Sequence, residues 1–403
     1  MKYFPEGAIF CIFVLIPLGC PRHSYRDYDV SFRDRLGLSI SQAVVAWGLV
    51  LLVGGAAGLI SMLICNYILS FGGKDSAGKH GISQVDATRL GGVAIVAYML
   101  MHLGYQTYVG LLLPPLNEAM IIATCFTYFL IGVYEDLSGL LSARIRFTLM
   151  LCLGLLTMYL APDVVLSPVG IPWVDFIVGV SPLSAILFTA LCVAFIPNAF
   201  NTADGANGLV AGTSALAFLA LISVAPPDLV PFLLAAVVGC LVFLVFNLTS
   251  GRFFLGDGGA YFLGAMAGLS LVVVSNNTAV SVWWLLSLVF YPIADLIWSM
   301  LRRLRQGLSP LKPDNQHFHN LLFAYLSAGN KSPMRANNIT GLSIVFAFSV
   351  TPFLLTLLEV WSTTDDQWFF LILGQWAFYI LGSKYLNDRL CVLPDAIVRN
   401  VTT

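Results

Sequence analysis

The segment AILFTALCVAFIPNAFNTADGANGLVAGTSALAFLALISVA, residues 185–225, sets a polar stretch between two apolar runs. The polar part runs from Asn198 to Leu209 and contains three Asn, one Asp and two Gly. Polar groups are costly in hydrocarbon, so they are rarely placed there without a use. The segment therefore predicts two membrane helices with functional groups between them.

The composition supports a membrane protein. The chain has 403 residues, of which 58% are hydrophobic and 10% charged, with a mean hydropathy of +0.86. A soluble domain carries about 25% charged residues, so soluble classes are excluded. The net charge of −1 gives no sign of a nucleic-acid partner.

Gaps between charged residues predict an all-α integral membrane protein, a polytopic bundle of about 11 transmembrane helices, because a crossing takes roughly 20 apolar residues. The expected spans are 42–72, 91–113, 119–134, 147–162, 183–197, 207–225, 230–249, 258–276, 281–300, 339–359 and 367–384. We divide the chain into an N-terminal segment 1–41 of uncertain topology, one transmembrane catalytic domain 42–384, and a cytoplasmic tail 385–403.

Charged loops predict the orientation. Alternate crossings put 73–90, 135–146, 198–206, 250–257, 301–338 and 385–403 on one face. Every Lys and Arg beyond residue 41 lies in these segments or at their edge, and the opposite loops contain none. Cytoplasmic loops collect Lys and Arg, so this face is expected to be cytoplasmic and to carry the active-site cleft. The four Arg within 21–41 disagree with this alternation.

Four carboxylates fall at helix ends on the predicted cytoplasmic face: Glu135, Asp136, Asp204 and Asp257. Gathered carboxylates repel one another unless a cation lies among them. Mg²⁺ accepts one or two carboxylates and takes further ligands from water and substrate phosphates. The sequence therefore predicts a Mg²⁺ site, with Mn²⁺ as an alternative metal.

Other polar residues on this face suit a phosphorylated substrate. Arg89, Arg144 and the pair His317 and His319 can bind phosphates. Three asparagines offer donors and acceptors to a base or a sugar: Asn198, Asn201 and Asn207. Asp295 lies inside an expected helix, where a charge is costly, and it either lines the cavity or pairs with Arg302 or Arg303.

Five segments together resemble the polyprenyl-phosphate N-acetylhexosamine-1-phosphate transferases, glycosyltransferase family 4. The central one, NAFNTADGANGL, is similar to that family's N-x-x-N-x-x-D-G-x-[DN]-G-L element. The others are the TRLGG segment (88–92), YEDLSGLLSARIRF (134–147), FLGDGGAYFLG (254–264) and YPIADLIWSMLRRLRQGLSPLKPDNQHFHN (291–320). The resemblance covers roughly residues 75–322, and the segments occur in the family's order.

The resemblance implies transfer of a sugar-1-phosphate from a UDP-sugar to a polyprenyl phosphate such as undecaprenyl phosphate, with release of UMP. This step starts a cell-surface glycan at the bacterial inner membrane. It further implies catalytic roles for Glu135, Asp136, Asp204 and Asp257, and metal binding by Asp257 and Asp136. The implied substrate-binding residues are Arg89, Asn198, Asn201, Asn207, Asp295, His317 and His319. Membrane lipid is an expected partner, and a homodimer stays open.

The chain departs from the family pattern at five positions. Three of these touch the expected site: Glu135 replaces the usual Asp, Asn207 stands where a second Asp is frequent, and Asn320 stands where a third His is frequent. The other two are Thr88 in place of Pro and Asn315 in place of Arg. These departures put the sugar specificity and the level of activity in doubt.

Rival interpretations stay open. The acids could be solvated helix-end residues, the Asn-rich stretch a polar turn, and the His pair a solvated loop. A secondary transporter would also have about eleven helices, although it predicts polar breaks at mid-membrane rather than at helix ends. A catalytically inactive family relative or a structural membrane protein is the other alternative.

Overall fold

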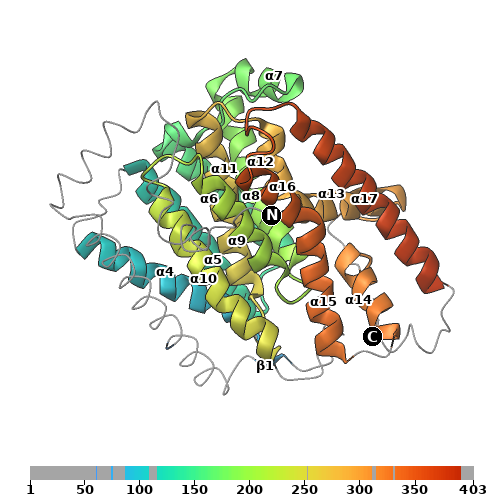
Figure 1. Ribbon diagram of the computed structural model, residues 1–403. Helices are drawn as coiled ribbons and strands as arrows, with labels where there is room; N and C mark the ends of the chain where they lie inside the picture. Colours follow the sequence, from blue (N-terminus) through green and yellow to red (C-terminus); the bar gives the residue numbers. More distant parts are fainter. Residues whose placement is uncertain are drawn as a thin grey trace, which may run out of the picture.

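The computed structural model describes residues 60, 74–75, 87–108, 116–251, 253–310, 315–329 and 332–391. All of segment 1–41, the expected span 42–72 apart from residue 60, most of the loop 73–90 and the end of the tail lie outside these ranges. The described chain is a helical bundle (Figure 1). Its only strands are a two-residue antiparallel pair, β1 (Lys74–Asp75) with β2 (Ala87–Thr88).

The helices follow one another with short connections. Their bounds are α4 (Gly91–Tyr108), α5 (Leu116–Ser138), α6 (Ala143–Leu160), α7 (Pro172–Val180), α8 (Pro182–Ala203), α9 (Leu209–Ile222), α10 (Val230–Ser250), α11 (Gly256–Asn277), α12 (Val282–Leu288), α13 (Phe290–Arg305), α14 (Phe318–Ala328), α15 (Pro333–Val345), α16 (Thr351–Leu357) and α17 (Gln367–Cys391). A π-helical segment, Phe346–Val350, joins α15 to α16.

The structure supports a polytopic membrane protein but not the expected count of 11 spans. Within the described ranges, seven helices are long and apolar enough to cross a membrane, or eight if the bent pair α12–α13 is one span. The helices found in the expected spans 91–113 and 207–225 are shorter, because α4 has an apolar part of only Gly91–Gly104 and α9 ends at Ile222. The expected loop 163–182 contains α7.

The expected span 281–300 is broken. α12 and α13 meet at an angle of 84° around Val289. Pro292 has no N–H to donate to the carbonyl of Leu288, so a continuous helix would lack a hydrogen bond there. Pro352 of α16 likewise has no N–H to donate to the carbonyl of Phe348, four residues earlier. Gln375 Nε2 of α17 donates a hydrogen bond to that oxygen instead, at 2.9 Å.

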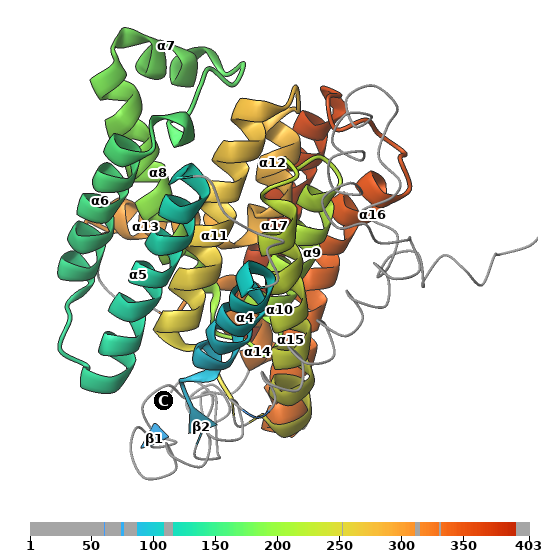
Figure 2. The ribbon, with the colours of Figure 1, turned by 90° about the vertical axis from the view of Figure 1, so that its left-hand side faces the viewer.

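Helix α11 is the core of the bundle. Nearly all of its side chains are buried, and it packs against α5, α8 and α4. Figure 2 shows α11 between α5, α6 and α8 on one side and α9, α10 and α17 on the other. Small residues permit this packing: Gly258 faces Gly132 of α5, and Gly264 faces Pro197 of α8.

Polar contacts gather at one end of the bundle. The C-terminal ends of α5, α8 and α10 meet there with the N-terminal ends of α6, α9, α11 and α15, joined by the hydrogen bonds described below. The short helix α7 lies at the opposite end, far from β1 and β2 (Figure 2). The segments singled out from the sequence therefore converge at one end.

We expect Gly132→Ala to destabilise the protein by about 1–3 kcal/mol, because the added Cβ would overlap the backbone of Gly258 and push α5 from α11. Gly104→Ala is the matched control, since a Cβ at Gly104 meets nothing within 4 Å and Ala favours helix. Thermal unfolding in detergent measures both. Equal melting temperatures for the two variants would contradict this packing.

Candidate active site

Asp136 caps the central helix. Its Oδ1 accepts the backbone N–H of Asp257 at 3.0 Å, and its Oδ2 accepts that of Gly258 at 2.9 Å. These N–H groups begin α11 and have no partner within the helix. A carboxylate at this position also interacts favourably with the helix dipole. Asp136 thus lies beside Asp257, as the sequence predicted, but both of its oxygens serve the fold.

The start of α4 and the residues just before it pack against the start of α11. The N–H groups of Gly91 and Gly92 donate to the carbonyls of Phe254 and Leu255, each at 2.9 Å. Gly256 has φ +74°, and a Cβ there would overlap the carbonyl oxygen of Arg89. Only glycine suits both the left-handed conformation and the close approach. Arg89 is thereby held near the carboxylates.

The carboxylate of Asp257 contacts two side chains, those of Arg146 and Tyr261. Its Oδ2 pairs with Nη1 of Arg146 at the start of α6, and the hydroxyl of Tyr261 lies at 3.5 Å. The Arg146 guanidinium also lies over the Tyr261 ring at 5.9 Å. Glu135 is 4.0 Å from Arg146 and uses its Oε2 to accept the backbone N–H of Leu141 at 2.7 Å. Arg146 therefore links two of the four expected carboxylates.

Asp204 stands at the end of α8 among like charges. Desolvation, followed by repulsion from the carboxylates of Asp257 and Asp136, raises the pKa of Asp204 to about 8. The backbone N–H of Gly256 and the charge of Arg89 act in the opposite direction. Both burial and the neighbouring carboxylates therefore disfavour a negative charge on Asp204, and an added cation would favour its ionised form.

The asparagines of α8 face different partners. Asn201 Nδ2 donates to the hydroxyl of Tyr261 at 3.1 Å, so it lies within the carboxylate cluster. Asn198 Nδ2 donates to the carbonyl of Ala194 at 2.8 Å and lies 3.5 Å from the sulfur of Met150. Asn198 is therefore turned toward its own helix and α6.

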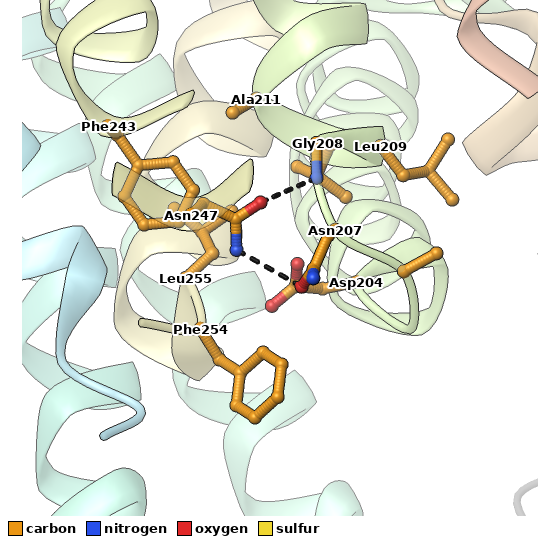
Figure 3. A pocket seen from close by; sticks show the side chains of 11 residues that line it. Asp204, Asn207, Gly208, Leu209, Ala211, Phe243, Asn247, Phe254 and Leu255 are labelled. Carbon is orange, nitrogen blue, oxygen red and sulfur yellow. Dashed lines mark hydrogen bonds between the residues drawn. The ribbon is translucent and has the colours of Figure 1, made fainter. Parts of the chain in front are cut away.

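Asn207 belongs to a buried amide network. Its Oδ1 accepts from Asn247 Nδ2 at 3.3 Å, and its Nδ2 donates to Asn338 Oδ1 at 2.8 Å. Asn247 Oδ1 also accepts the N–H of Gly208 at 2.7 Å, as Figure 3 shows. These residues border a small pocket, which is lined by Asp204, Ala206, Asn207, Gly208, Leu209, Val210, Ala211, Phe243, Asn247, Phe254 and Leu255.

Asp295 is fully buried, with an exposed fraction of 0%. Its Oδ2 lies 2.6 Å from Nδ1 of His317, and its Oδ1 accepts the N–H of Phe318 at 3.0 Å and the hydroxyl of Tyr379 at 2.7 Å. Of the two expected alternatives, a cavity lining or a pair with Arg302 or Arg303, neither describes these contacts. Asp295 caps α14 and fixes the orientation of His317.

The two histidines stack. The rings of His317 and His319 are 5.5 Å apart with an angle of 7° between them. His319 Nδ1 lies 3.0 Å from the hydroxyl of Tyr291, and its Nε2 packs against Gly205, where a Cβ would overlap it. Burial lowers the pKa of His319 to about 4, so its imidazole is neutral at neutral pH. The His-rich segment thus touches the Asp204–Gly208 turn.

Comparisons with known proteins agree with this geometry. The sequence pattern of glycosyl transferase family 4 matches residues 119–275, which contain Asp136, Asp204 and Asp257. The undecaprenyl-phosphate alpha-N-acetylglucosaminyl 1-phosphate transferase of Escherichia coli K12 is 26% identical over 306 residues, covering 73% of this chain and 78% of that protein. The decaprenyl-phosphate N-acetylglucosaminephosphotransferases of Mycolicibacterium smegmatis and Mycobacterium tuberculosis are 28% and 27% identical, covering 74% of this chain and 81% and 78% of theirs.

The family match and these relatives support the resemblance that the sequence indicated. The roles assigned to single residues stay predictions.

Sequence reasoning missed several residues of this site. It named Arg144, yet Arg146 holds Asp257. Ser142 is the N-cap of α6, and its side chain accepts the N–H of Ile145. Recognising this cap in the sequence would have fixed where α6 begins, and therefore which face of the helix carries Arg144 and which carries Arg146. Tyr379 and Asn337 come from distant helices, and no local signal in the sequence marks them.

We expect Asp136→Ala to lower the free energy of unfolding by about 1–3 kcal/mol, because two N–H groups at the start of α11 would lose their acceptor. Glu135→Gln is the matched control, since its amide oxygen can still accept from Leu141. Thermal unfolding in detergent separates this loss from any effect on chemistry. An unchanged melting temperature for Asp136→Ala would show that the cap does not stabilise the helix.

Proposed function

We propose that this protein transfers N-acetylhexosamine-1-phosphate from a UDP-sugar to a polyprenyl phosphate, giving UMP and polyprenyl-diphospho-sugar. One observation carries the proposal: Asp136, Asp204 and Asp257 converge with Arg89 and Arg146 at one end of a membrane-helix bundle. The names of the relatives make N-acetylglucosamine the first sugar to test and undecaprenyl or decaprenyl phosphate the first acceptors.

The reaction is a phosphoryl transfer. An oxygen of the lipid phosphate forms a bond to the β-phosphorus of the UDP-sugar, and the bond from that phosphorus to the bridging oxygen breaks, so UMP leaves with the oxygen. A phosphate monoester has a second pKa of about 6, so the nucleophile is largely dianionic at neutral pH. No side chain has to remove a proton, which agrees with Asp136 accepting backbone N–H groups.

The protein's own residues would act by position and charge. Arg146 and Arg89 lie beside the carboxylates and can bind phosphate oxygens. The turn at Gly256 holds the backbone of Arg89 against the start of α11, where Asp136 and Asp204 accept the first N–H groups of the helix. Asn207 and Asn247 border the pocket next to Asp204, and their hydrogen bonds to each other and to Gly208 fix this wall of the pocket. Catalysis of phosphoryl transfer consists mostly of such positioning and charge stabilisation.

The residues present fit a divalent cation. Within the described ranges, no group of three or more His, Cys, Asp or Glu is arranged to hold a metal. Mg²⁺ needs only one or two carboxylates when substrate phosphates complete its shell. We assign Asp257 as the main ligand, with Asp136 next to it as the sequence suggested. Bound Mg²⁺, or Mn²⁺, would neutralise charge on the transferring phosphates.

We place the site at the cytoplasmic side of a bacterial inner membrane. At the site's end, the described part of the chain carries Arg89 before α4, Arg144 and Arg146 in the first turn of α6, and Arg335 in the first turn of α15. The described connections at the end of α7 carry acids without Lys or Arg. Cytoplasmic loops collect positive charge. The relatives named above come from bacteria, and a UDP-sugar is a cytoplasmic substrate.

We expect Asp257→Asn to lower the rate of UMP release at least about a hundredfold, because a neutral amide binds a divalent cation and Arg146 more weakly. The assay contains purified protein, undecaprenyl phosphate, Mg²⁺ and a panel of UDP-sugars. Asp366→Asn, an exposed acid between α16 and α17, is the matched control with unchanged activity. Full activity in folded Asp257→Asn would refute the metal assignment.

Removal of divalent cations should abolish transfer in the same assay. Chelation with EDTA is expected to stop UMP release, and Mg²⁺ or Mn²⁺ added in excess should restore it, because the site's carboxylates and the donor diphosphate otherwise repel one another. The melting temperature should change little, since the caps of α11 are made by the protein itself. Turnover that persists in EDTA would argue for a metal-independent mechanism.

A further inference from the structure

The start of α15 packs directly on the Asp204–Gly208 turn. Asn337 Oδ1 accepts the backbone N–H of Asn207 at 2.8 Å, and Asn338 Oδ1 accepts from the side chain of Asn207 at 2.8 Å. Gly341, one turn further along, faces the carbonyl oxygen of Asn207, where a Cβ would overlap it. α15 lies outside residues 119–275, which match the family.

The backbone fixes which way each amide points. Asn338 Nδ2 donates to the carbonyl of Leu248 at 2.8 Å, so its Oδ1 is the atom left for Asn207. Asn247 Nδ2 donates to the carbonyl of Phe253 at 2.6 Å and lies 3.3 Å from Asn207 Oδ1. Position 207 therefore meets an acceptor on one side and a donor on the other.

An amide satisfies both neighbours, whereas a carboxylate does not. Asp at position 207 would set a second negative oxygen against Asn338 Oδ1, and a buried polar atom without a partner is costly. Rotating the amide of Asn338 would supply a donor but would break its bond to Leu248. The network thus explains in physical terms why this chain carries Asn where the sequence pattern allows Asp.

We propose that Asn337 and Asn338 are positioning residues that hold the Asp204–Gly208 turn through Asn207, and that Asn338 selects an amide over a carboxylate at position 207. The proposal rests on the proposed transferase function for its catalytic consequence. The turn contains Asp204 of the carboxylate cluster and Gly205, which packs against His319. A displaced turn would therefore disturb both halves of the site without removing any group that touches substrate.

Isosteric variants of Asn337 test the positioning role. Asn337→Leu removes the acceptor for the Asn207 N–H, and we expect kcat/KM for the UDP-sugar to fall about tenfold, the effect of one buried hydrogen bond. Asn337→Asp keeps an acceptor in the same place and should retain most of the activity. KM for the polyprenyl phosphate should change less than KM for the UDP-sugar, because the turn borders the pocket next to Asp204.

A double-mutant cycle tests the selection of an amide. Asn207→Asp alone should lower both the melting temperature and kcat/KM. In an Asn338→Ala background the same change should cost several-fold less, because the opposing oxygen is gone and water can reach the carboxylate. Asn277→Asp and Asn277→Leu, on an exposed residue at the far end of α11, are the matched controls with unchanged behaviour.

The outcomes separate the two proposals. Active wild type with additive effects of Asn207→Asp and Asn338→Ala would overturn the selection, and Asn337→Leu with wild-type kinetics would overturn the positioning role. Inactivity of the wild type with every UDP-sugar would refute the proposed function alone, since the melting temperatures of the cycle still measure the coupling. If Asn337→Leu fails to fold, the cycle still decides the selection, and loss of activity in folded Asn337→Asp, which keeps an acceptor at this position, would overturn the positioning role.

Discussion

The N–H groups at the start of α11 must find acceptors inside the bundle, and the rest of the site follows from that need. α11 is the central helix, and each buried N–H left alone would cost about 1–3 kcal/mol. Asp136 takes two of them, and Asp204 takes the N–H of Gly256. Two of the site's acids are thus also helix caps. These hydrogen bonds hold Asp136 and Asp204 beside Asp257, so the caps that stabilise the fold also position the acids of the site.

Much of this arrangement could be predicted from the sequence, because charge and apolar length are local properties. The polar segments at helix ends and their convergence followed from positive-inside counting and alternation. The number of spans did not, because apolar length alone cannot separate a crossing helix from a short or broken one. Pro292 was visible as a break, yet the apolar run around it masked the bend of 84°. α7 was missed because nine residues give too little periodicity.

Residue roles were harder to predict than residue identities. The acids were found because four carboxylates at helix ends stand out in a chain with 10% charge. Their hydrogen-bond partners come from distant parts of the chain, which local sequence patterns do not reveal. Tyr379 bonds to Asp295 over a separation of 84 residues, and Asn337 to Asn207 over 130 residues. Asp295 illustrates the consequence. Its place inside an apolar run predicted a buried charge with a partner, and its contacts orient His317 and cap α14.

The amide at position 207 also bears on the charge of the site. Burial, and then the charges of Asp257 and Asp136, already raise the pKa of Asp204. A further carboxylate at position 207, which adjoins the same pocket, would add to that repulsion. The amide avoids the extra charge and gains a hydrogen bond to α15. Asn at position 207 therefore lowers the negative charge of the site and lets α15 hold the Asp204–Gly208 turn through hydrogen bonds from Asn207.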